Sequence, residues 1–163
     1  MRQRFGWPFI MLPNNKCLSR ENGQWSIEAR AFPIPYTPFT HNFWTLIDAK
    51  HCVIDQLHGL AVDPQTGQIH AIGNSSHVLQ VIRRRDIVWS LQAGQPTAIC
   101  TTGLQKEVQK RWQAAVNAIP AINALHLPYP DWWQHFYIAN SNTVFNTLGL
   151  IMGFSELFCL LNT

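Results

Sequence analysis

Hydrophobic and polar residues alternate along the middle of the chain, between about residues 40 and 91. A period of two is typical of β-strands that bury one face. Two turn-forming segments, 63–67 (DPQTG) and 73–76 (GNSS), interrupt the alternation. The pattern predicts an antiparallel meander, with strands at 41–47, 52–60, 68–72 and 78–84 and a fifth strand at 87–91.

The period changes after residue 103. Leu104, Val108, Trp112 and Ala115 recur at helical spacing and predict an amphipathic helix over 104–119 that ends at Pro120. A short helix and then an aromatic-rich loop are expected at 120–139. The last core helix is expected to begin at 141–143, after strong capping residues, and to end at Gly153: its apolar positions are Val144, Leu148 and Ile151.

These elements predict an α+β fold, because strands with one apolar face need helices to cover it. We expect an antiparallel sheet of four or five strands packed against two or three helices. Residues 1–39 are rich in proline and are expected to form an extended arm across the core at 40–153, with one strand at 25–30. The length of 163 residues fits a single domain, 1–163.

The composition argues against some classes of function, such as nucleic-acid binding. The chain is 47% hydrophobic and only 13% charged, with a net charge of +3. Its basic residues are scattered and do not interleave with aromatic residues, so nucleic acid is not an expected partner. No apolar run reaches the roughly 20 residues that a membrane span needs. Two prolines interrupt the apolar N-terminus, which argues against a classical signal peptide and leaves a cytoplasmic location or non-classical export.

The four cysteines form no CxxC motif, so a zinc or redox motif is not expected. Cys52, near a predicted hairpin tip, is the one most exposed to reaction. A metal site made by His41, His51 and His58 is disfavoured, because the odd spacing from His51 to His58 puts them on opposite faces of a regular strand. We therefore predict no metal and no cofactor.

The candidate chemistry comes from a histidine and a serine that are far apart in sequence. If the first hairpin turns at 49–50, His41 lies opposite His58 on the neighbouring strand. Ser141 lies at the predicted start of the last helix, where backbone amides and the helix dipole can stabilise an anion. A triad of Ser141 as nucleophile, His41 as base and His58 as orienting residue is one interpretation. The alternative is structural: residues 140–142 form only a helix cap, and both histidines are satisfied within the sheet.

The order of these elements resembles the circularly permuted papain-like domains of the NlpC/P60 superfamily. In that family a histidine on the first strand precedes a helix that opens with Asn-Cys-Asn, and the corresponding run here is Asn140-Ser141-Asn142-Thr143. The resemblance covers roughly 41–153. It implies that His41 matches the catalytic histidine, His58 the third polar residue and Ser141 the nucleophilic cysteine. The chain departs from the family at the nucleophile itself.

The resemblance implies a hydrolase or acyltransferase that attacks an amide or ester, peptidoglycan peptides being one substrate class. Asn140, Asn142, Trp44 and Trp133 are then the predicted substrate-binding residues. A bacterial effector or toxin with an inhibitory protein partner fits a small domain of this kind. The alternative is an inactive papain-like pseudo-enzyme that serves as a protein-interaction module, with the aromatic segment 132–137 docking a partner.

Overall fold

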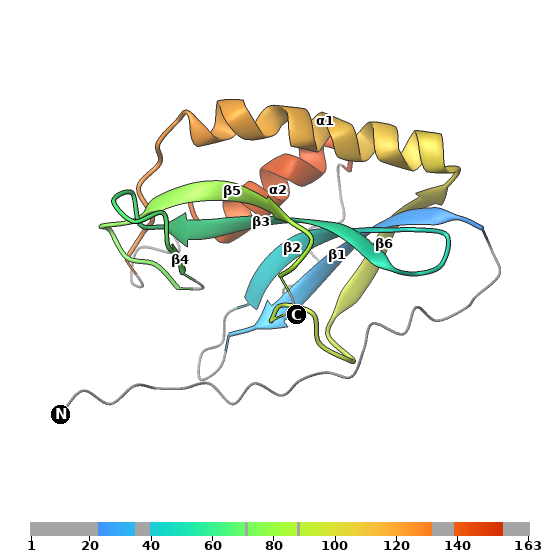
Figure 1. Cartoon of the computed structure of the whole chain (residues 1–163), viewed down its shortest axis with the longest axis horizontal. Helices are drawn as coiled ribbons and strands as arrows, with labels where there is room; N and C mark the ends of the chain where they lie inside the picture. Colours follow the sequence, from blue (N-terminus) through green and yellow to red (C-terminus); the bar gives the residue numbers. More distant parts are fainter. Residues whose placement is uncertain (1–22, 35–39, 71, 88, 132–138, 155–163) are drawn as a thin grey trace.

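The structure is a computed structural model, and it describes residues 23–34, 40–70, 72–87, 89–131 and 139–154 (Figure 1). The predicted α+β class is confirmed: within these residues the chain forms one antiparallel sheet of six strands and two helices. The strands are β1 (Trp25–Pro33), β2 (Thr40–Ile47), β3 (Val53–Val62), β4 (Ile69–His70), β5 (Val78–Arg84) and β6 (Thr97–Gly103).

The last strand in the sequence, β6, pairs with the first strand, β1. β3 pairs with β2 along one edge and with β5 along the other, because Gln56 lies opposite both Thr45 and Arg84. β2 pairs with β1, and β1 pairs with β6. The two-residue β4 pairs with the end of β3. In the described part of the chain, β4, β5 and β6 each pair with a single strand and are therefore the outer strands of the sheet.

Both helices lie on the same side of the sheet (Figure 1). α1 (Gln105–Asn123) and α2 (Ser141–Ile151) are the two helices of the described residues. The predicted end of the first helix at Pro120 is wrong, since α1 continues through that proline. The Asn123 side chain accepts a hydrogen bond from the backbone N–H of Val81 and donates one to its carbonyl, which ties the last turn of α1 to β5.

One face of the sheet packs against the helices and forms the main core. Trp44 stacks on Phe145 of α2 at 4.5 Å between ring centroids, and its indole N–H donates to the Phe145 carbonyl at 2.9 Å. Residues of the neighbouring strands whose side chains point to the same face of the sheet belong to the same core cluster. Its fully buried members include Ile27, Ala31, Trp44, Leu57, Ala61, Ala115 and Leu148.

The opposite face of the sheet is buried as well. Phe43, Thr45, Gln56 and His58 have no exposed surface, and they belong to the other phase of β2 and β3. Almost every residue of β2 is consequently buried, so this strand lacks the one-sided burial that its alternation suggests. The polar residues in this second buried layer need hydrogen-bond partners within the protein, and Thr45 and Gln56 find them in backbone carbonyls.

Three expectations about the sheet are corrected. Residues 87 and 89–91 form no strand. β6 at 97–103 was not predicted, although it completes the sheet. The strand predicted at 25–30 is present as β1 at 25–33, but it lies within the sheet, between β2 and β6, and does not cross the sheet's surface as part of an arm. Residues 1–22 and 35–39 lie outside the described residues.

Candidate functional site

The first turn of α2 is built by two asparagines. The Asn140 side chain accepts hydrogen bonds from the backbone N–H groups of Asn142 and Thr143, while the Thr143 hydroxyl accepts from the Asn140 N–H. This capping box confirms the predicted helix start. The Asn142 side chain accepts from the Asn42 N–H and donates to the Thr40 carbonyl, both at 3.2 Å. Asn140 and Asn142, predicted to bind substrate, are engaged in building the fold.

Ser141 lies on the helix side of the sheet. Gly59 of β3 faces it closely: a Cβ at that position would lie 2.9 Å from the Ser141 carbonyl oxygen and 2.7 Å from the Val144 Cβ. Burial raises the pKa of the Tyr129 phenol, and the nearby Ser141 side chain opposes that shift. A neutral phenol with a raised pKa cannot act as a general base for Ser141 near neutral pH.

His41 lies on the other face of the sheet. Its ring is parallel to that of His58 at 5.3 Å between centroids, and it also lies beside Phe43 and Trp89. His41 is only 3% exposed. The predicted contact between the two histidines is present, but the register is shifted by two residues: His58 lies opposite Phe43, not opposite His41.

The predicted meeting of His41 with Ser141 is therefore wrong for this structure. His41 and Trp44 are three positions apart on β2, so their side chains leave opposite faces of the strand. Trp44 packs against α2, whose first residue is Ser141, whereas His41 packs against His58 and Trp89. The sheet separates the proposed base from the proposed nucleophile.

The buried histidines belong to a chain of hydrogen bonds in which each group donates to the next, from His41 through His58 and Gln56 to the Ile87 carbonyl. The Gln56 side-chain amide donates to the Ile87 carbonyl at 2.9 Å, so the Gln56 oxygen is left to accept from His58 Nε2 at 3.2 Å. With Nε2 as its donor, neutral His58 accepts at Nδ1, and His41 Nε2 must donate to it at 3.0 Å. Ser90 also donates to the Gln56 oxygen, at 3.4 Å. The anchor on the Ile87 carbonyl thus fixes the tautomers of both histidines.

Burial makes both histidines weak bases. Desolvation lowers the pKa of His41 from 6.5 to about 4. Desolvation and the neighbouring His41 lower the pKa of His58 well below 6.5. The charged forms are disfavoured because no carboxylate is hydrogen-bonded to either ring among the described residues. A base with a pKa near 4 has little driving force to take a proton from a hydroxyl group at neutral pH.

The remaining predicted residues have other roles or lie outside the described residues. Trp44 is fully buried in the core, so it cannot line an open substrate site. Trp133 and the segment 132–137 lie outside the described residues. Cys52 is disulfide-bonded, which corrects its assignment as the reactive thiol. His51 adopts a left-handed backbone conformation in the turn between β2 and β3, with φ of 59°.

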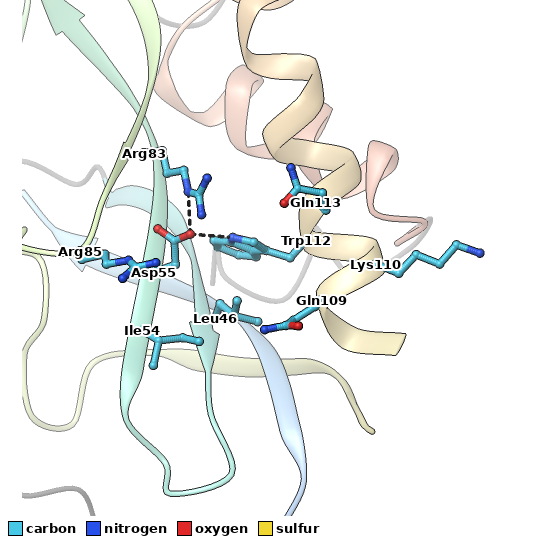
Figure 2. A pocket seen from close by; sticks show the side chains of 9 residues that line it. All are labelled: Leu46, Ile54, Asp55, Arg83, Arg85, Gln109, Lys110, Trp112 and Gln113. Carbon is cyan, nitrogen blue, oxygen red and sulfur yellow. Dashed lines mark hydrogen bonds and ion pairs between the residues drawn. The ribbon is translucent and has the colours of Figure 1, made fainter. Parts of the chain in front are cut away.

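A second cluster was missed by the sequence reasoning. Asp55 of β3, Arg83 of β5 and Trp112 of α1 meet on the helix side of the sheet and line a pocket of about 380 Å³ (Figure 2). Asp55 is 2% exposed, and charged residues are rarely buried unless they are paired. Asp55 and Arg83 are charged residues within strands that are otherwise largely apolar. A charged residue in such a strand is the signal that could have identified this cluster.

Comparisons with known proteins give no family. The chain matches no protein family, no curated protein and no solved structure. No helix among the described residues is long and apolar enough to cross a membrane. In the same residues, no three histidine, cysteine, aspartate or glutamate side chains are grouped so that they could hold a metal ion. The geometry of the chain itself is therefore the basis for any functional proposal.

Proposed function

We propose that this chain is a protein-interaction module on a permuted papain-like scaffold, without serine hydrolase activity. The observation that carries the proposal is the separation of Ser141 from His41 by the sheet. Serine is a weak nucleophile and needs a general base within hydrogen-bond reach. The lowered pKa of His41 also makes that ring a poor base.

Two features support the scaffold. An antiparallel sheet packs against a helix that opens with Asn140-Ser141-Asn142, and the start of this helix contacts β2 and β3. This arrangement is the one that the resemblance to papain-like domains implies. The arrangement around the helix start fits this scaffold, while the histidine projects to the other face of the sheet.

The edge of β6 supports binding of a protein partner. Thr97–Gly103 contains neither a charged residue nor a proline, the two devices that commonly protect an edge strand from pairing. No strand of the described ranges pairs with its outer edge. Ile99, in the middle of β6, is 61% exposed. Such an edge can accept an extended peptide as an additional strand, held by main-chain hydrogen bonds.

A groove next to this edge can supply specificity. It has a volume of about 500 Å³ and lies between β6, α1 and the end of α2. Thr101 and Thr102 of β6 line one side, and Arg111 and Ile151 of the two helices line the others. Side chains on one face of an added strand would enter this groove, because alternate residues of a strand point to the same side. The expected partner is therefore an extended polypeptide segment.

The proposal is tested on the full chain with chemical probes and selected peptides. A fluorophosphonate on the natural protein and a thiol-directed acyl probe on Ser141→Cys should leave the mass at position 141 unchanged. Peptides selected from a random extended library should bind the natural chain and lose at least tenfold in affinity for Ile99→Lys, because a lysine blocks strand addition at an edge. Ile72→Lys, at a site that is 57% exposed elsewhere, is the matched control and should bind normally.

Two results would contradict the proposal. An adduct on Ser141, or on the cysteine variant, would restore the hydrolase that the resemblance to NlpC/P60 implies. Selected peptides that bind Ile99→Lys as tightly as the natural chain would exclude β6 as the binding edge.

A further inference from the structure

The pocket between β3, β5 and α1 contains a guanidinium group that is held in place but only partly used. Arg83 Nε donates to Asp55 Oδ2 at 2.7 Å. The same oxygen accepts from the Trp112 indole N–H at 3.0 Å, and Asp55 Oδ1 accepts from the backbone N–H of Gln56 at 3.1 Å. Asp55 is thus fixed by three donors from two strands and a helix. A carboxylate held in this way orients the arginine that binds it.

The two terminal amino groups of Arg83 remain available. Among the described residues, Arg83 has no polar partner besides Asp55. Its side chain is 40% exposed, so the terminal groups can reach a ligand. The terminal end of a guanidinium presents two parallel N–H donors, a geometry that matches a planar carboxylate.

The local charge favours a ligand with a single negative charge. Figure 2 shows Arg83 and Arg85 on two sides of Asp55, so two positive charges and one negative charge meet here. The Lys110 side chain extends away from Asp55 in the same view. A carboxylate would neutralise the remaining positive charge, whereas a phosphate dianion would leave an excess of negative charge.

The rest of the pocket suits the body of an organic acid. Leu46 and Ile54 contribute apolar surface next to the Trp112 ring, and Gln109 and Gln113 offer amides at the rim (Figure 2). The volume of about 380 Å³ lies near the lower end of the range for small-molecule sites, roughly 300–1,000 Å³. The size therefore selects a compact ligand.

We infer that this pocket binds the carboxylate of a small organic acid with an apolar body, with Arg83 as the forked donor and Arg85 as the second cation. The inference does not depend on the proposed function. The binding groups of this pocket are Arg83 and Arg85, whereas the proposed peptide site uses the edge of β6 and the groove beside it. Failure at one site leaves the other untouched.

The test is a titration of the full chain with benzoate, followed by the indole N–H resonance of Trp112 in NMR spectra. Benzoate should shift this resonance in a saturable manner, since the indole bonds to the carboxylate that holds Arg83. Benzamide, which has the same shape without the charge, should bind at least tenfold more weakly. Arg83→Lys should weaken benzoate binding by about tenfold or more, because it keeps the charge but loses the fork.

A second variant and a matched control guard against misfolding. Arg83→Lys alters the support of a buried carboxylate, so Arg85→Gln provides an independent test that leaves the bonds of Asp55 intact. It should also weaken benzoate binding severalfold. Arg84→Gln is the control: its partner is Asp86 and its side chain belongs to the other phase of β5, so benzoate affinity should not change.

The inference is overturned if benzoate and benzamide shift the Trp112 resonance equally, or if Arg84→Gln weakens binding as much as Arg85→Gln. A shift that does not saturate would mean that no built site exists. Saturable binding of inorganic phosphate in preference to benzoate would overturn the assignment to a carboxylate.

Discussion

The buried pair of His41 and His58 should make the stability of the fold strongly dependent on pH. Both histidines have a lower pKa in the folded state than in the unfolded state, where the ordinary value of 6.5 applies. The unfolded chain therefore binds protons more readily. Stability is fully present above pH 6.5 and is lost as the pH falls from there toward the folded-state pKa values.

The magnitude follows from the shift of His41. With a folded-state pKa of about 4, lowering the solution from about pH 8 to about pH 5 should reduce the free energy of unfolding by about 2 kcal/mol for this residue. The pKa of His58 is also lowered, so this residue should add to the loss. The contribution of His41 alone is a substantial part of the roughly 5–15 kcal/mol by which proteins of this size are stable.

Urea unfolding at a series of pH values measures this directly, with fluorescence and circular dichroism as probes. His41→Gln keeps a donor toward His58 but cannot titrate in this range, so the loss between about pH 8 and about pH 5 should be smaller by about 2 kcal/mol. The natural chain and the variant are compared by the change in their free energy of unfolding between the two pH values. A variant that is less stable at every pH therefore does not affect the comparison. His126→Asn is the control, because it removes an exposed histidine whose left-handed backbone an asparagine tolerates.

A free energy of unfolding that stays constant over this range would refute the reasoning. So would an unchanged loss in His41→Gln. In the natural chain, NMR titration gives an independent check: the ring protons of His41 and His58 should show no transition near pH 6.5.

Three further predictions follow from the contacts of α2 and from the cysteines. Gly59→Ala should lower the free energy of unfolding by about 1–3 kcal/mol in urea denaturation, because the added methyl group meets Val144 and the Ser141 backbone; an unchanged value would mean that α2 moves away freely. Asn140→Ala removes the helix cap and should cost about 0.5–2 kcal/mol by the same assay, whereas Asn140→Ser should recover most of that loss. Maleimide in denaturant without reductant should add two labels, four cysteines minus the pair that contains Cys52, and four labels after reduction; four labels in both cases would exclude the disulfide. In the folded chain Cys100 should react slowly, because burial raises its pKa.

The elements with strong local signals were predictable from the sequence. β5 matches the predicted range 78–84, since its alternation is regular and a turn-forming segment precedes it. The start of α2 was predicted from its cap. β6 was missed because the run from Thr97 to Gly103 has no clear period, and its pairing with β1 defines it instead. The end of α1 was missed because the contacts of Asn123 with Val81 outweigh the local effect of Pro120.

The candidate site could be predicted only in part. The contact of His41 with His58 followed from the hairpin, although the register differs by two residues. The face that His41 takes could not be predicted. Both phases of β2 are buried, and Phe43 and Trp44 are equally suited to a core, so the alternation does not indicate which phase receives the helices. That choice is made by the stacking of Trp44 on Phe145, a contact between residues 101 positions apart.

The pairing of β1 with β6 bears on the order in which the sheet assembles. Trp25 lies opposite Gly103, 78 positions later in the chain, whereas β1, β2 and β3 are joined by short connections. Closing so long a segment costs entropy that local hairpins avoid, so the meander should form first and β6 should dock late. A strand with one neighbour also opens more readily than an inner strand, because fewer contacts must break. In hydrogen exchange we therefore expect the amides of β6 to lose protection before those of β2 and β3.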